Sequence, residues 1–206
     1  MQNKLNVLDR LAIRSVGKDQ RTLILKHASD QDLIKAIAAG CQASMRCLFV
    51  RHKERVYKFI LRSVGDATVA MDLTSDVFVA VWTQAGTFRG QSSVSTWLLS
   101  IARYKAVSAL RRRAHETVDI DQLTIVDGAD DPETAIEKRD RSRLVRECVL
   151  QLSLEHREIV GLLYYDDRSM EEVSKIARIP LGTAKSRASY ARRRLSDLLV
   201  AAGVAT

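Results

Sequence analysis

Residues 169–198 read SMEEVSKIARIPLGTAKSRASYARRRLSDL, and this stretch decides the fold of the C-terminal part of the chain. Ser169 can cap a helix, and Glu172 stands three residues further on, which is the spacing of a capping box. Pro180 ends that helix, because the residue before a proline is driven out of the helical region. A second helix then begins near Leu181. Two helices joined by so short a turn predict a helix-turn-helix, a motif that places its second helix in the major groove of DNA.

The second helix carries an apolar face and a polar face at helical spacing. The apolar face consists of Leu181, Ala184, Ala188, Ala191, Leu195 and Leu198. The polar face and its border, which we predict to contact DNA, consist of Thr183, Lys185, Ser186, Arg187, Tyr190 and Arg194. From Thr183 to Leu195 there are five basic residues (Lys185, Arg187, Arg192, Arg193 and Arg194) and no acidic one. The alternative, a solvated helix of a bundle, usually balances lysine with glutamate at i,i+4.

The composition of the chain is that of a helical protein with a polyanionic partner. Its 206 residues, 46% of them hydrophobic, are enough for one large or two small domains. Only 2 prolines and 9 glycines interrupt it, which favours helices. The net charge of +8 is compatible with nucleic acid, although many basic proteins bind none.

Several classes of protein are not expected from this sequence. No apolar run approaches the roughly 20 residues needed to span a bilayer, and the N-terminus lacks the apolar core of a signal peptide, so we expect a cytosolic location without a membrane partner. The 3 cysteines are widely spaced and should be reduced, and we expect no metal and no cofactor. No nucleophile–base pair and no phosphate-binding glycine loop stand out, so no catalytic residue is expected.

Four zones follow one another along the chain. Residues 1–27 form a weakly patterned N-terminal extension, and residues 28–116 are dense in helical periodicity. Residues 117–140 hold eight acidic side chains (Asp119, Asp121, Asp127, Asp130, Asp131, Glu133, Glu137 and Asp140) against Lys138 and Arg139. Residues 141–200 form a second helical unit that ends in the helix-turn-helix. The predicted fold is all-α, with two small helical domains joined by an acidic linker.

Helices in the first domain are predicted after a cap at Ser29, over about 44–63, over about 67–84 and over about 96–113, with a polar loop at 86–95. The last helix mixes aromatic with basic residues. They are Trp97, Arg103, Tyr104, Lys105, Arg111, Arg112 and Arg113. This mixture suits single-stranded nucleic acid, because bases stack on rings while cations follow the phosphates. A core tryptophan with a solvated basic helix end is the alternative.

Three segments in this order resemble the extracytoplasmic-function sigma factors of bacterial RNA polymerase. DLTSDVFVAVW (72–82) is similar to the segment that docks on the polymerase clamp. FRGQSSVSTWLLSIARYKAVSALRRR (88–113) is similar to the part that melts and reads the minus-ten element. LSLEHREIVGLLYYDDRSMEEVSKIARIPLGTAKSRASYARRRL (152–195) is similar to the part that reads the minus-thirty-five element.

The resemblance implies a transcription initiation factor that binds core RNA polymerase and promoter DNA, while the polymerase performs the chemistry. It implies contact with the clamp of the largest subunit and the flap of the second-largest, and an anti-sigma partner. The implied clamp residues are Asp72, Asp76, Phe78 and Trp82. The implied minus-ten residues are Trp97, Arg103, Tyr104, Lys105, Arg111 and Arg112, and the helix-turn-helix residues named above would read the minus-thirty-five element. The acidic linker would thread near the RNA path of the polymerase or act as a plain spacer.

Some positions leave alternatives open. Tyr104 stands where the family commonly has Asn, Ser108 where it has Asp, and Ser75 where it often has Gln. Phe78 and Trp82, four residues apart, could complete a core or form an exposed protein contact. The rival to the whole reading is a helix-turn-helix regulator with a helical sensor or dimerisation domain, and a helical RNA-binding protein is a third possibility.

Overall fold

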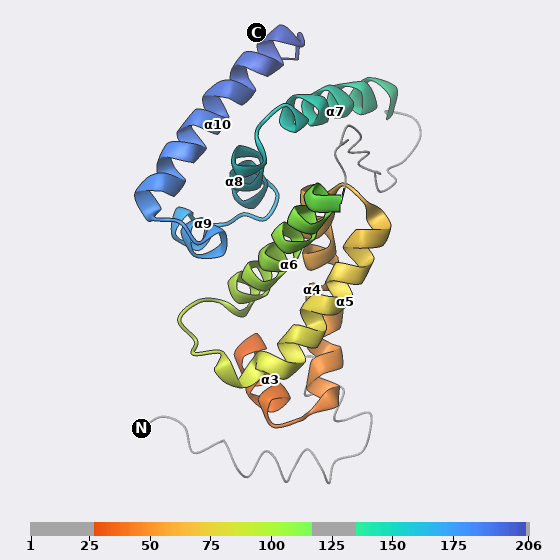
Figure 1. The fold of residues 1–206 in the computed structure, drawn as a ribbon, viewed down its shortest axis with the longest axis vertical. Helices are drawn as coiled ribbons and strands as arrows, with labels where there is room; N and C mark the ends of the chain where they lie inside the picture. The colour runs from red at the N-terminus through yellow and green to blue at the C-terminus, as the bar shows by residue number, and fades with distance from the viewer. Residues whose placement is uncertain (1–26, 117–134, 205–206) are drawn as a thin grey trace.

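The computed structural model describes residues 27–116 and 135–204, with the side chains of 27–113 and 143–204. The regular elements in these ranges are all helical, as the sequence predicted (Figure 1). They are α3 (Asp30–Ala38), α4 (Gln42–Val64), α5 (Ala67–Gln84), the short 3-10 helix η1 (Ala85–Thr87), α6 (Val94–Glu116), α7 (Ala135–Leu150), α8 (Leu154–Tyr164), α9 (Met170–Ala177) and α10 (Leu181–Ala201).

The N-terminal unit consists of α3, α4, α5 and α6, which pack around one apolar core. Side chains such as Leu48, Ile60 and Val77 are fully buried there. Local signals set the ends of the helices: the Asp66 carboxylate accepts a hydrogen bond from the Val69 amide at the start of α5. Gly65, with φ of 71°, ends α4 in the left-handed conformation that glycine adopts without strain.

The C-terminal unit consists of α7 to α10 and contains the predicted helix-turn-helix, formed by α9 and α10. The capping box is present: the Ser169 hydroxyl accepts from the Glu172 amide, and the Glu172 carboxylate accepts from the Ser169 amide. Ala184, Ala188 and Ala191 are buried, so α10 approaches α8 and α9 closely. The predicted apolar face is confirmed for these alanines and for Leu195 and Leu198, which pack on a buried cluster, whereas Leu181 is only half-buried.

The two units pack against each other (Figure 1). Helix α9 lies against α6, and α8 contacts α4. One cluster of buried side chains continues from the N-terminal core to Ile159, Val173 and Ile176. This docking places α9, the first helix of the helix-turn-helix, against α6, the helix that mixes aromatic with basic residues.

The structure extends some expected helix boundaries. Helix α6 begins at Val94, two residues before the expected start, and α7 begins at Ala135, inside the range expected as linker. The acidic composition of 117–140 predicts a linker over the whole range, whereas the structure continues helix α7 through 135–140. The N-terminal extension 1–26 and the linker segment 117–134 lie outside the described residues.

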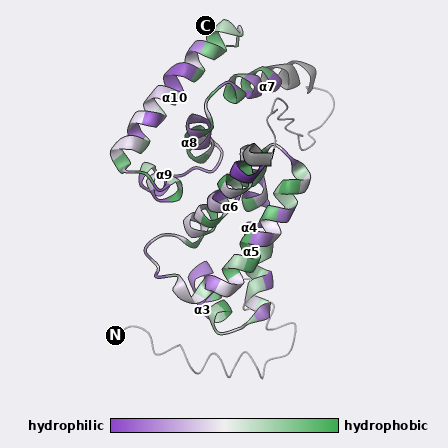
Figure 2. Cartoon of the chain, in the orientation of Figure 1, coloured by the Kyte–Doolittle hydropathy of each residue, from purple (hydrophilic) through white to green (hydrophobic). Residues whose placement is uncertain are grey.

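The hydropathy of the helices differs from one to another. Figure 2 shows hydrophobic residues over much of α5, whereas hydrophilic residues recur along α10. In the part of the chain that the structure describes, no helix has both the length and the apolar character required to cross a membrane.

Candidate nucleic-acid interface

The predicted reading surface lies on the outer side of α10. Lys185, Ser186, Tyr190 and Arg194 are exposed. Thr183 and Arg187 are partly covered. The Ser186 hydroxyl donates a hydrogen bond to the Gly182 carbonyl at 3.0 Å, which fixes its rotamer within the helix. A helix that buries small alanines on one side and presents cations and an aromatic ring on the other can enter a major groove.

Two side chains from the start of α8 hold residues of this surface, and the sequence reading missed both. Glu155 Oε2 lies 2.7 Å from Arg187 Nη2. The ring of His156 lies 4.8 Å from the ring of Tyr190, between centroids, and His156 Nδ1 is 2.7 Å from the Ser153 hydroxyl. The acidic partner that the recognition helix lacks in its own sequence is therefore supplied by a neighbouring helix.

The aromatic and basic residues of α6 have different surroundings. Trp97 is half-buried and packs against Phe88, with 5.2 Å between ring centroids. Tyr104 is 61% exposed, and Arg111 and Arg112 are exposed. The Arg103 guanidinium is paired with Glu158 of α8. The structure therefore brings these residues together on one helix but engages part of the surface in contacts with the C-terminal unit.

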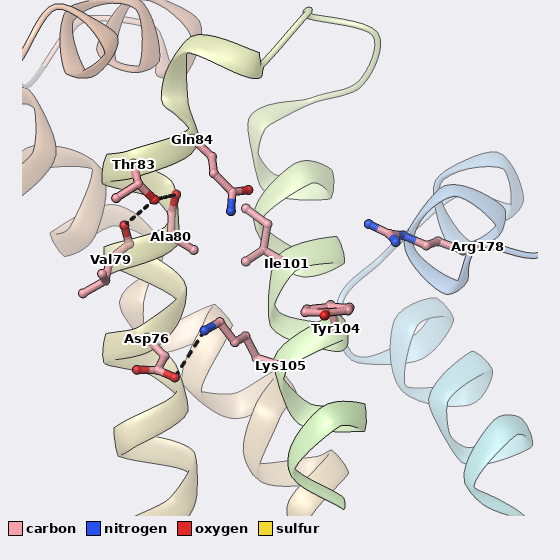
Figure 3. A pocket seen from close by; sticks show the side chains of 9 residues that line it. All are labelled: Asp76, Val79, Ala80, Thr83, Gln84, Ile101, Tyr104, Lys105 and Arg178. Carbon is pink, nitrogen blue, oxygen red and sulfur yellow. Dashed lines mark hydrogen bonds and ion pairs between the residues drawn. The ribbon is translucent and has the colours of Figure 1, made fainter. Parts of the chain in front are cut away.

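A groove of about 590 Å³ runs between α5 and α6 and reaches the turn of the helix-turn-helix (Figure 3). Lys105 Nζ lies 3.3 Å from Asp76 Oδ2 across this groove. The Tyr104 ring lies between α6 and Arg178, which comes from the end of α9 (Figure 3). A cation predicted for DNA and a carboxylate predicted for polymerase thus pair with each other in this conformation.

A smaller hollow of about 260 Å³ lies where the polar loop meets α6. Its lining consists of Gln91, Ser92, Thr96, Trp97, Ser100 and Lys175. All but the last come from the segment expected to melt DNA. The hollow combines hydroxyl and amide groups with one aromatic ring, a set that can hydrogen-bond and stack on a base.

The candidate polymerase surface on α5 needs one correction. Phe78 is buried and contacts Phe49 edge-to-face, with centroids 4.8 Å apart, so it completes the core. Asp72 and Asp76 are exposed, and Trp82 is 38% exposed. Met71 and Val79 on the same helix are also exposed, and the sequence reading did not single them out. Met71 and Val79 are eight residues apart and lie near each other on one side of the helix, and this spacing of apolar residues could have indicated them from the sequence.

A polar network joins α9 to the loop and first turn of α6. The Glu172 carboxylate accepts hydrogen bonds from the hydroxyls of Thr96 and Ser93. Arg168 lies 3.2 Å from that carboxylate and donates to the Ser95 hydroxyl at 3.0 Å. Burial acts to raise the pKa of Glu172, but these hydrogen bonds and the charge of Arg168 outweigh it, so the pKa is lower than usual.

A second contact joins α4 to the turn between α8 and α9. Arg62 pairs with Asp166, whose side chain is only 4% exposed, and its guanidinium lies 5.3 Å from the centre of the Tyr165 ring. Burial raises the pKa of Asp166, and the charges of Arg62, Arg168 and Arg55 offset only part of this effect. Burial therefore makes ionisation of this carboxyl group less favourable than it is in water.

Two helical units, one with a helix-turn-helix and one with an aromatic and basic helix, define a DNA-binding protein of the transcription machinery. The sigma-70 region 2 family matches residues 48–116, and sigma-70 region 4 matches residues 148–197. The ECF RNA polymerase sigma factor SigK of Mycobacterium tuberculosis is 31% identical over 178 residues, which cover 84% of this chain and 95% of that protein. The chain belongs to the extracytoplasmic-function sigma factors, and it is a transcription initiation factor.

Other relatives agree with this assignment. The RNA polymerase sigma-H factor of Pseudomonas aeruginosa is 26% identical over 187 residues, covering 85% of this chain and 96% of that protein. Among solved structures, the sigma factor RpoE in complex with the anti-sigma factor NepR from Bartonella quintana is similar, with 27% identity and a TM-score of 0.57 over 73% of this chain and 93% of that one. CnrH in complex with the cytosolic domain of CnrY, at 23% identity and a TM-score of 0.64 over 84% of this chain and 99% of that one, shares the fold.

Proposed function

We propose that this chain directs core RNA polymerase to promoters by reading two DNA elements with two surfaces. The C-terminal unit, which we take as residues 141–200, reads the minus-thirty-five element as duplex. The N-terminal unit, residues 28–116, binds polymerase and the minus-ten element, and 117–140 connects them. The observation that carries this proposal is the pairing of an exposed basic face on α10 with an aromatic and basic α6 in one chain.

Readout of the minus-thirty-five element falls to the exposed face of α10. Arg187 and Lys185 are suited to guanine edges, and Ser186 and Thr183 to several bases. Tyr190 and Arg194 lie further along the helix and follow the backbone. Contacts to phosphates would fix the register of the helix, and contacts to base edges would supply sequence preference.

Strand opening at the minus-ten element falls to α6 and the loop before it. A base turned out of the stack needs a pocket and a stacking surface. The hollow beside Trp97 has suitable dimensions and donors, and the exposed Tyr104 ring offers a second surface for stacking. Arg103, Lys105, Arg111 and Arg112 would follow the phosphates.

Polymerase contact falls to the exposed side of α5. Met71, Val79 and Trp82 provide an apolar patch, with Asp72 and Asp76 beside it. Buried aromatic anchors ringed by charges are typical of protein interfaces. We propose that this surface binds the clamp of the largest polymerase subunit. The C-terminal unit would bind the flap of the second-largest subunit.

Regulation and location follow from the same assignment. The similarity to RpoE, which is in complex with NepR, supports a dedicated anti-sigma partner for this chain as well. Because RNA polymerase acts in the cytoplasm of bacteria, we propose the same location for this chain. We propose no catalysis by the chain itself, because synthesis belongs to the polymerase.

Reconstituted transcription tests the proposal. Core polymerase and the purified chain are supplied with a pool of templates that carry randomised upstream sequence, and the transcripts are sequenced. We expect initiation only when the chain is present, from templates enriched in two motifs at fixed spacing. If no template yields RNA, and the chain instead binds duplex DNA tightly by itself as a dimer, the regulator with a sensor domain is the better assignment.

A further inference from the structure

In the docked conformation, α9 covers the surface that we assign to the melted strand. Thr96, in the first turn of α6, is 1% exposed. Lys175 of α9 lines the hollow next to Trp97 and donates to the Gln91 carbonyl at 2.9 Å. Helix α9 therefore forms one wall of this hollow and narrows the space left for a DNA strand.

The contacts made by α9 resemble those that a nucleic-acid strand would make. Glu172 presents one carboxylate oxygen, Oε1, to the hydroxyls of both Ser93 and Thr96. A phosphate would offer the same kind of acceptor to the same donors. The carboxylate therefore fills an anion position at the mouth of the hollow.

A second acidic side chain repeats this arrangement about two turns further along α6. Glu158 of α8 pairs with Arg103, and both side chains are largely buried by the contact. Arg103 is one of the cations that we assign to the minus-ten phosphates. Two carboxylates of the C-terminal unit thus engage hydrogen-bond donors and a cation of the strand-binding surface.

The docking leaves the other DNA surface open. Lys185, Tyr190 and Arg194 on α10 stay exposed while α9 covers α6. The free chain can therefore present its duplex-reading face, whereas its strand-binding face is occupied around Thr96 and Arg103. Both faces become available together only when the two units separate.

We propose that Glu172 and Glu158 act as an internal substitute for the promoter strand, so that the free chain blocks its own minus-ten surface. This inference depends on the strand-binding role proposed for α6. Polymerase would bind each unit separately and so pull α5 and α6 away from the C-terminal unit. The phosphates of the promoter strand then take the place of these carboxylates. The chain then binds single-stranded DNA only in the complex in which melting is useful.

The test removes both negative charges without changing side-chain shape. The Glu158→Gln/Glu172→Gln double variant of the full chain keeps a residue that is compatible with the capping box at position 172. The matched control is Glu147→Gln/Glu171→Gln, which has the same change in net charge on α7 and α9. Glu147 pairs with Arg143 at the surface, and Glu171 is exposed. Glu158→Gln alone, which leaves the capping box untouched, serves as a third variant.

Two measurements are made on each protein without polymerase. Binding of a fluorescein-labelled single-stranded DNA of randomised sequence is followed by anisotropy at one salt concentration, and the radius of gyration is measured by X-ray scattering. We expect the double variant to bind at least about tenfold more tightly than the control and to have a larger radius of gyration, because about 1.4 kcal/mol lost from docking is a tenfold change in the equilibrium. Glu158→Gln alone should shift both readouts in the same direction and by less.

Equal DNA affinity in the double variant and the control overturns the inference, and so does a wild-type chain that is already extended in solution. Transcription by the wild-type chain with core polymerase reports on the proposed function separately. If the double variant opens by scattering but gains no affinity for single strands, the assignment of α6 to the strand fails together with the inference. If transcription succeeds and the variants neither open nor bind more tightly, only the internal substitute is rejected.

Discussion

At the scale of single residues, Arg187 shows how one side chain is shared between two partners. Its position on the polar face of α10 was predictable from helical periodicity, and the structure places it at the edge of the exposed surface. Its ion pair with Glu155 was not predictable, because no sequence spacing relates α8 to α10. Periodicity within a helix can be read from a single sequence, whereas pairing between helices depends on how they pack.

Replacing Arg187 with Ala tests the assignment of this residue to a base edge. We expect a loss of about 1–3 kcal/mol at one position of the minus-thirty-five element and little change elsewhere. Binding of the polymerase complex to a panel of single-base promoter variants measures this. A uniform loss across the panel would assign Arg187 to a phosphate instead.

Replacing Glu155 with Gln tests whether the carboxylate restrains Arg187. The substitution removes a negative charge that faces the phosphates and releases the guanidinium, so we expect tighter binding to duplex DNA and weaker discrimination between promoter sequences. The salt dependence of binding should steepen by up to about one unit, because one more cation can reach a phosphate. Glu171→Gln, with the same charge change away from α10, is the control, and identical behaviour of the two variants would contradict a specific role for Glu155.

At the scale of elements, α6 differs most from its prediction. Helical periodicity alone indicates one apolar face for this helix, with Leu98 and Ala102 on it, and both are buried. Leu99 and Thr96 are buried as well. Helix α9 packs on α6 and contributes to this burial, since the Thr96 hydroxyl donates to Glu172 of α9. A helix with two buried sides has no clear amphipathic pattern, so periodicity alone could not reveal this second contact.

The exposed side of α5 gives a prediction about polymerase. Asp76→Lys should weaken binding to core polymerase, because it reverses a charge beside the apolar patch. It also places like charges near Lys105, but exposed pairs contribute only about 0–1 kcal/mol, so the thermal stability should change little. Polymerase affinity and melting temperature are measured together. The control is Glu54→Lys, the same charge reversal at a fully exposed site on α4. Unchanged polymerase affinity in Asp76→Lys would reject the assignment of this face of α5 to polymerase binding.

The lowered pKa of Glu172 gives a pH dependence for the contact between α9 and α6. A carboxyl group with a lowered pKa contributes stability that is fully present above its ordinary value of 4.5 and is lost as the pH falls through the lowered value. Glu172→Gln should therefore be less stable than wild type at neutral pH, and the difference should shrink in acid. Urea unfolding of both proteins across this range measures it. Asp166, whose raised pKa acts in the opposite direction, is present in both proteins and cancels in the comparison.

At the scale of the whole molecule, two helical units and a helix-turn-helix could be predicted from sequence, but their docking could not. Capping signals, proline positions and apolar spacing are local and fix helices to within a few residues. The contacts that join the units, such as Arg62 with Asp166, connect residues about a hundred positions apart. Such contacts are made by charged residues, and the sequence does not distinguish these from charged residues on a solvated surface.

The Arg62–Asp166 pair tests how firmly the two units are held together. Removing one member leaves a buried charge without its partner, which is strongly destabilising, whereas replacing both with apolar residues is often neutral or better. We therefore expect Arg62→Met alone to weaken the docking by on the order of 3 kcal/mol, and Arg62→Met/Asp166→Leu to recover most of that loss. Scattering and urea unfolding report the separation of the units, and Arg46→Met, an exposed arginine on the same helix, is the control. If the double variant is as destabilised as Arg62→Met, then the loss in Arg62→Met does not come from leaving the Asp166 charge without a partner. Recovery in the double variant would mean that the charged pair adds little net stability to the docked state, which suits a contact that must open when polymerase takes each unit to a separate site.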